Sequence, residues 1–163
     1  MSKIYVDEIH PKTAGSAVKS PNIPAWRLGV VETNYTTTGW KDLPIDTSTT
    51  SLSTDNSRFI NGGVTVSGGQ VTVPVSGFYQ VNYTGRADLV GSGYFQIAME
   101  VNDTGSGSLS AIVDSPSSAS ETLQLSQVLY LEANDAIHFL FNVSSDTSYH
   151  IENNSMISGA FLG

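Results

Sequence analysis

Three histidines are the residues of this chain that could most directly bind a metal or transfer a proton. They are His10, His138 and His150, and none belongs to a His-x-x-x-His pair or to an Asp/His cluster at ligand spacing. His138 lies in the phase opposite that of Phe139 and Phe141 within an alternating run. We therefore interpret His138 as a surface or intersubunit histidine, with a role as a metal ligand as the alternative.

Carboxylates in expected turns form a second group that could do chemistry. Asp103, Asp114, Asp135 and Asp146 would offer the oxygen ligands that Ca²⁺ prefers, but their spacing fits no calcium-binding loop. We interpret them as solvated turn residues and keep calcium as the alternative. The residue counts allow a Ser-His-Asp triad, yet the sequence contains no Gly-x-Ser-x-Gly nucleophile elbow. The sequence thus predicts a non-enzymatic protein without a cofactor.

The elements that must position these residues are β-strands. The stretch QVTVPVSGFYQVNYTGRADLV (70–90) has apolar or small residues at every second position from Tyr79 to Leu89, which predicts a long strand with one buried face. Pro74 and Gly77 precede this strand and predict a rigid corner, because proline lacks a ladder N–H. The 163 residues are 39% hydrophobic but only 13% charged. Ser, Thr, Asn and Gly fill the polar positions and favour turns and strands over helices.

Similar alternating runs recur along the chain. Strands are expected at 25–32 and 39–44, within 57–81, at 77–90, and within 93–103, 108–114, 121–132, 134–144, 148–152 and 155–163. About ten strands without long crossovers predict an all-β fold, an antiparallel sandwich or barrel over residues 25–163. The expected core residues are Tyr79, Val81, Tyr83, Phe95, Ile97, Leu129, Phe139 and Phe141.

Residues 1–24 differ from this strand-rich part. Pro11, Pro21 and Pro24 disfavour helix and central strand, so we expect an extended arm. The net charge of the chain is −8, yet residues 1–27 have four basic and two acidic side chains, a balance of +2. A basic arm on an acidic body indicates docking to another protein, with chance or a frayed terminus as the alternative. The expected attachment residues are Lys3, Ile4, Tyr5, Val6, Ile9, Lys12 and Lys19.

The composition also argues against several partners and sites. The acidic body disfavours nucleic acid and anionic membranes, because phosphate binding requires clustered Lys and Arg. No apolar run approaches the length of a membrane span, and we expect neither membrane insertion nor an export signal. The absence of cysteine excludes disulfides and thiolate metal sites.

Three stretches resemble the jelly-roll domain of complement globular heads and tumour-necrosis-factor-like proteins. They are GQVTVPVSGFYQVNYTGRAD (69–88), LYLEANDAIHFLF (129–141) and SMISGAFLG (155–163). The resemblance covers about residues 25–163 and implies a ten-stranded jelly roll that assembles as a homotrimer. Aromatic residues in phases opposite the expected core are candidates for the trimer interface, and His138 joins them. The candidates are Phe78, Tyr94, Tyr130 and His138.

The N-terminal stretch MSKIYVDEIHPKTAG (1–15) resembles the opening of short structural proteins from tailed bacteriophages, especially those of cyanobacteria and marine bacteria. This resemblance implies a virion surface protein whose arm binds another phage protein, as a capsid spike, a decoration (cement) protein or a short fibre head. The alternative is the receptor-binding tip of a tail fibre that recognises host cell-surface glycans. Candidate receptor residues in expected loops are Asn102, Asp103, Asp114, Asp146 and Tyr149.

Overall fold

The computed structural model describes residues 23–47, 58–89, 93–102, 109–115, 120–143 and 149–163, which contain β-strands and no helix. The strands form two antiparallel sheets, so the expected all-β, sandwich-type fold is confirmed. The described residues form thirteen strands rather than about ten: a strand at Thr33–Tyr35 lies outside the expected runs, and the run within 57–81 contains three short strands before the long strand that begins at Gly77. The strands are β1 (Ala25–Gly29), β2 (Thr33–Tyr35), β3 (Gly39–Asp42), β4 (Phe59–Asn61), β5 (Thr65–Ser67), β6 (Gln70–Thr72), β7 (Gly77–Leu89), β8 (Gly93–Val101), β9 (Leu109–Ser115), β10 (Ser120–Leu131), β11 (Ala136–Val143), β12 (Tyr149–Ile151) and β13 (Met156–Phe161).

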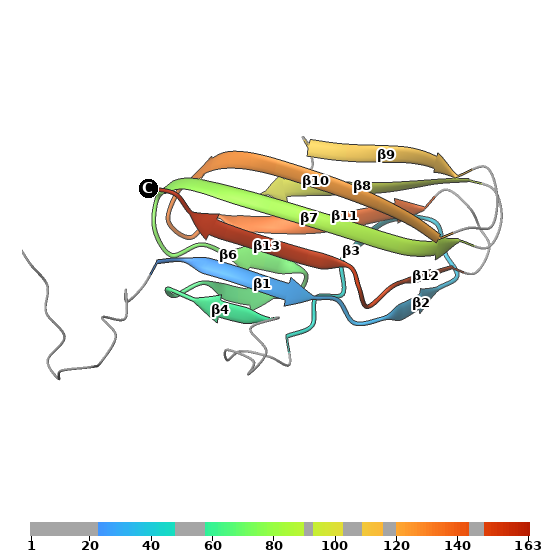
Figure 1. Ribbon diagram of the computed structural model, residues 1–163, viewed down its shortest axis with the longest axis horizontal. Helices are drawn as coiled ribbons and strands as arrows, with labels where there is room; N and C mark the ends of the chain where they lie inside the picture. Colours follow the sequence, from blue (N-terminus) through green and yellow to red (C-terminus); the bar gives the residue numbers. More distant parts are fainter. Residues whose placement is uncertain (1–22, 48–57, 90–92, 103–108, 116–119, 144–148) are drawn as a thin grey trace, which may run out of the picture.

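The seven-stranded sheet is organised around β7. One edge of β7 pairs with β10 along nearly its whole length, and the other edge pairs first with β13 and then with β12. Strand β13 continues the sheet to β1 and β4, whereas β12 continues it to β2. In Figure 1, β10, β7, β13 and β1 lie side by side in one layer.

The six-stranded sheet is organised around β11. Strand β8 pairs with one edge of β11, and β6 and β3 share the other edge. Strand β9 extends the sheet beyond β8, and β5 extends it beyond β6. The inward-facing residues of the two sheets pack against one another to form a single core.

The buried core follows the apolar phases of the long strands. Seven of the eight expected core residues are buried; they are Tyr79, Val81, Tyr83, Phe95, Ile97, Phe139 and Phe141. Leu129 is only half-buried, although it packs against the core. Leu129 belongs to β10, which is at the edge of the seven-stranded sheet and pairs only with β7 among the described strands. The core-facing side chains of this edge strand are therefore mostly half-buried rather than buried.

The expected corner at Pro74 and Gly77 carries the chain from one sheet to the other. Strand β6 of the six-stranded sheet ends at Thr72, and β7 of the seven-stranded sheet begins at Gly77. A Cβ on Gly77 would lie 2.4 Å from the ring of Phe161 and 2.8 Å from the carbonyl oxygen of Gly163. Glycine is therefore required where the chain passes close to the last strand.

The sandwich has two distinct ends. At the first end, which we call the terminal end, strand β1 begins and the C-terminus lies (Figure 1). There the backbone N–H of Phe78 donates to the carbonyl oxygen of Gly163. At the opposite or distal end, β7 finishes beside β12 and β2 (Figure 1). Residues 1–22, which include all of the expected attachment residues, lie outside the described part of the chain.

Candidate functional site

The outer face of the seven-stranded sheet is the candidate functional site. In β7 and β10 the even-numbered residues point away from the core, because successive side chains alternate between the two faces of a strand. The outward residues of β10 are exposed, and those of β7 are exposed or half-buried. The register pairs these residues directly across the two strands, with Phe78 opposite Tyr130 and Asp88 opposite Ser120.

The terminal end of this outer face is apolar. The rings of Phe78 and Tyr130 meet edge to face with centroids 5.3 Å apart, and the two residues are 52% and 60% exposed. Val128 is two residues from Tyr130 on the same face and is also exposed. Leu162 is exposed as well, and its backbone N–H donates to the carbonyl oxygen of Phe78. We call Phe78, Val128, Tyr130 and Leu162 the apolar end.

Uncharged polar side chains fill the centre of the outer face. The Gln80 amide donates to the Ser126 hydroxyl at 2.8 Å, and this hydroxyl donates to Asn82 Oδ1 at 2.8 Å. An open depression of about 210 Å³ lies beside this network, lined partly by Arg27 and Ser158. The hydrogen bonds fix the side chains across β7 and β10, which leaves a preorganised and nearly uncharged surface.

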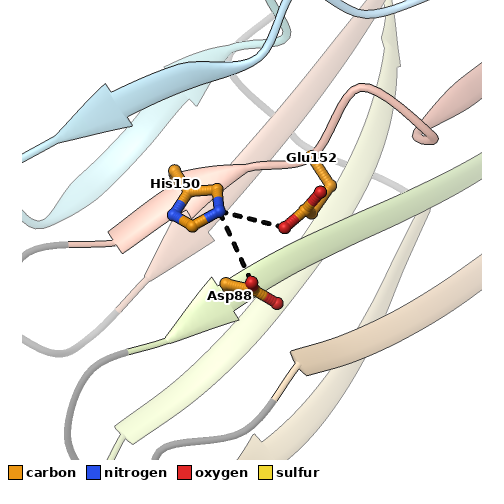
Figure 2. A group of neighbouring side chains, drawn as sticks. All are labelled: Asp88, His150 and Glu152. Carbon is orange, nitrogen blue, oxygen red and sulfur yellow. Dashed lines mark hydrogen bonds and ion pairs between the residues drawn. The ribbon is translucent and has the colours of Figure 1, made fainter.

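The distal end of the outer face carries a charged cluster, Asp88, His150 and Glu152, shown in Figure 2. His150 Nε2 lies 2.9 Å from Glu152 Oε1 and 3.4 Å from Asp88 Oδ2. The side chain of His150 is 30% exposed, that of Asp88 is 35% exposed and that of Glu152 is 18% exposed. Both carboxylates therefore converge on one ring nitrogen at a site that solvent reaches.

Backbone pairing builds this cluster. His150 of β12 is the register partner of Asp88 of β7, and Glu152 is two residues further along, on the same side. The backbone N–H of Glu152 donates to the Arg86 carbonyl oxygen at 3.0 Å, which holds the chain beside β7 after β12 ends. The Ser120 hydroxyl, from β10, donates to Asp88 Oδ1 and leaves Oδ2 directed at His150.

The electrostatics of the cluster favour an ionised Asp88. The hydrogen bond from the Ser120 hydroxyl is the largest cause that lowers the pKa of the Asp88 carboxyl, and desolvation opposes it. A hydrogen bond with Glu152 and the proximity of His150 and Arg86 lower this pKa further. Ser120 donates to the carboxylate rather than to the imidazole, so these residues do not form a Ser-His-Asp nucleophilic relay.

The expected trimer-interface residues do not form one surface. Phe78 and Tyr130 are exposed neighbours on the outer face, as their phases predicted. Tyr94 is 37% exposed but belongs to β8 of the six-stranded sheet. His138 was wrongly placed at the surface, because it is only 7% exposed between its cross-strand partners Gln70 and Glu100.

The expected receptor residues are also dispersed. Tyr149 was wrongly assigned to an exposed loop: it belongs to β12, is 1% exposed and donates from its hydroxyl to the Thr37 carbonyl oxygen at 2.9 Å. Asp114 belongs to strand β9 rather than to a turn. Asn102 is exposed at the end of β8, near the start of β11. Two further candidates, Asp103 and Asp146, lie outside the described residues.

Asn102 and Asp135 have a structural role in a turn. Asn102 has a left-handed φ of 59°, donates from its amide to Asp135 Oδ1 at 2.7 Å and accepts from the Ala136 backbone N–H. The other oxygen of Asp135 accepts from the Glu132 backbone N–H at 2.8 Å. Both carboxylate oxygens of Asp135 therefore accept hydrogen bonds within the turn. Asp135 is one of the four acidic residues for which calcium binding was the alternative interpretation.

Sequence reasoning missed the charged cluster. Asp88 is in the outward phase of a recognisable strand, and His150 and Glu152 share one phase, so the signal for an exposed position was present. The pairing of β7 with β12, which brings positions 88 and 150 together, joins segments far apart in the chain. No local pattern specifies such a pairing.

No protein-family model matches this chain, and a search of the curated proteins finds no match. In the described part of the chain, no helix is long and apolar enough to cross a membrane. The geometry of the outer face is therefore the structural basis for the function proposed for this chain.

Proposed function

We propose that this chain is a non-enzymatic structural protein of a bacteriophage virion. In this proposal, residues 25–163 form a homotrimeric jelly-roll head on the virion surface, and residues 1–24 form the arm that binds another virion protein. The protein acts as a capsid spike, a decoration protein or a short fibre head. The phage assignment comes from the resemblance of the N-terminal stretch, and the head assignment is supported by the strand pairing.

The strand pairing supports a jelly roll because its antiparallel pairs are nested. Strand β8 pairs with β9, β7 with β10, β6 with β11 and β1 with β13, so each pair encloses the one before it along the chain. A chain doubled back on itself and then rolled into two sheets produces this nesting. The additional pairs β7–β13 and β8–β11 close the two sheets, as such rolling requires.

The observation that carries the assembly proposal is the composition of the outer face. The chain has 15 acidic residues, yet the outward positions of β10 contain no charge and those of β7 contain only Arg86 and Asp88, near the distal end. Protein interfaces are depleted in acidic residues and lysine at their centre and enriched in aromatic residues. An exposed aromatic pair beside hydrogen-bonded amides and hydroxyls matches this composition.

Light scattering coupled to size-exclusion chromatography tests the assembly. We expect a trimer mass at micromolar concentration for the full chain. Replacing the exposed pair (Phe78→Ser with Tyr130→Ser) should shift the mass toward the monomer, because it removes the exposed aromatic pair of the outer face. Trp40→Ser is the matched control, since Trp40 is 47% exposed on β3 of the other sheet. A monomer mass for the unmodified chain contradicts the proposal.

The proposed division between head and arm has its own test. A chain that starts at Pro24 retains β1, which begins at Ala25, and should form folded trimers. We expect these trimers not to join virions, because the apolar and basic residues of the arm would supply the contacts. Normal copy number of the shortened protein in virions would instead assign attachment to the head, with the apolar end as the first surface to test.

Receptor binding at the distal end is the second candidate function. The observation that favours it is the position of the charged cluster at the end of the sandwich away from Pro24, where an arm-anchored head would face solvent. Competition of virion adsorption by the isolated trimer tests this candidate. Adsorption that stays unchanged at saturating trimer contradicts it and leaves the structural role.

A further inference from the structure

We infer that Asp88, His150 and Glu152 form a binding site for a divalent transition-metal ion, with Zn²⁺ as the representative. Each residue offers one ligand atom, an imidazole nitrogen or a carboxylate oxygen, and these three atoms lie within 4.8 Å of one another. They come from β7, from β12 and from the residue that follows β12, and the two carboxylates approach the imidazole from separate directions (Figure 2). This inference is independent of the proposed virion function.

The separations between the ligand atoms fit a small metal ion. Around a tetrahedral Zn²⁺ with bonds of about 2.0–2.1 Å, neighbouring ligand atoms are about 3.3 Å apart. The observed separations from His150 Nε2 are 2.9 Å to Glu152 and 3.4 Å to Asp88. Both separations from the histidine are therefore close to those of two ligands on one ion, and the two carboxylate oxygens lie within 4.8 Å of each other.

The ligand types select the class of metal. One imidazole nitrogen with two carboxylate oxygens is a donor set that suits Zn²⁺ and related transition metals, whereas Ca²⁺ and Mg²⁺ prefer oxygen ligands throughout. Three protein ligands leave at least one coordination position open. Because the side chains are partly exposed, water or an oxygen ligand from outside could occupy that position.

The ligands are held in place before a metal binds. The hydroxyl of Ser120 fixes one oxygen of Asp88. The backbone pairing of β12 with β7 places His150 opposite Asp88, and the next residue, Ile151, is buried. Glu152 is anchored by its backbone bond to Arg86. Outer hydrogen bonds of this kind orient metal ligands and raise affinity.

A protonated His150 would also balance the two carboxylates, so the test must separate a metal site from a simple ion pair. The chelator-treated, dialysed full chain is titrated with Zn²⁺ against a chromophoric competitor, and separately with Co²⁺ while visible absorption is recorded. We expect one Zn²⁺ per chain, Zn²⁺ binding tighter than Ca²⁺, and a visible Co²⁺ spectrum. Zn²⁺ should also raise the melting temperature, because it binds only the paired strands.

The variants His150→Gln, Asp88→Asn and Glu152→Gln should each weaken Zn²⁺ binding by at least about tenfold. Glu132→Gln is the matched control, an exposed carboxylate after β10 at the terminal end, and His10→Gln controls for the arm. Both controls should bind as the unmodified chain does. Circular dichroism of each variant without metal shows whether its fold is retained. Unchanged Zn²⁺ affinity in folded His150→Gln, or tighter binding of Ca²⁺ than of Zn²⁺, overturns the inference.

Discussion

Removing the hydroxyl group from either of two buried tyrosines on β7 should change the stability of the protein, in opposite directions for the two residues. Tyr83 is 1% exposed, its ring packs edge to face on Phe139 at 5.6 Å, and its hydroxyl has no hydrogen-bond partner among the described residues. Tyr79 is equally buried, but its hydroxyl donates to the Val75 carbonyl oxygen at 2.9 Å. Both side chains point into the core from the same strand, so each is the control for the other.

The magnitudes follow from the state of each hydroxyl. A buried polar group without a partner costs roughly 1–3 kcal/mol, so Tyr83→Phe should raise the free energy of unfolding by about 1 kcal/mol. Tyr79→Phe should lower it by about 0.5–1.5 kcal/mol, because the hydrogen bond to Val75 is lost. For a domain of this size, each kcal/mol shifts the melting temperature by about 2–4 °C.

Urea denaturation at one fixed protein concentration measures both variants, which keeps any contribution from assembly constant. We expect the midpoint of Tyr83→Phe above, and that of Tyr79→Phe below, the midpoint of the unmodified chain. A Tyr83→Phe variant that is clearly less stable would refute the reasoning. It would mean that the Tyr83 hydroxyl binds a buried water or another group in solution.

Two other perturbations test the core and its tyrosines. Phe139→Ala should lower the free energy of unfolding by roughly 3–5 kcal/mol, since Phe139 is fully buried; an unchanged urea midpoint would show that its phase does not face the core. At alkaline pH, burial raises the pKa of Tyr149 to about 12 from 10.0, so the unfolded chain releases this proton first. The contribution of the protonated Tyr149 hydroxyl to stability is complete below pH 10 and is lost as the pH rises toward 12. Urea midpoints at pH 8–11.5 should therefore fall, and fall less in Tyr149→Phe; equal declines would argue against this assignment.

The faces of the long strands could be predicted from the sequence. The alternation from Tyr79 to Ala87 specified which residues of β7 enter the core, and the same pattern identified Phe139 and Phe141 of β11. Side chains on a strand have a period of two, so one half-buried strand specifies its own two faces. The exposure of Phe78 and Tyr130 followed from the same rule.

The wrong predictions concern residues whose burial depends on the neighbouring strands. His138 occupies the phase opposite Phe139, yet it is covered, because β11 is flanked on both edges by other strands and its outward side chains are crowded by their neighbours. Tyr149 was listed with the exposed loop residues although a strand was expected at 148–152, and it belongs to the three-residue strand β12. Its burial comes from stacking on Tyr35 of β2, a contact between distant segments that no local pattern encodes.

The outer face carries both the apolar end and the charged cluster. On one edge of β7, no single described strand pairs along the whole length, so β13 and β12 share this edge. Strand β13 pairs with residues 79–84 of this edge, and β12 pairs with residues 87–89, the last three of β7. The break between β13 and β12 allows His150 and Glu152 to enter the face from a separate segment, while the apolar end remains continuous across β10, β7 and the residue after β13. One long strand thus connects a surface suited to association with a site suited to an ion. For this reason, loss of the exposed aromatic pair should change assembly and leave metal binding intact, and loss of His150 should do the reverse.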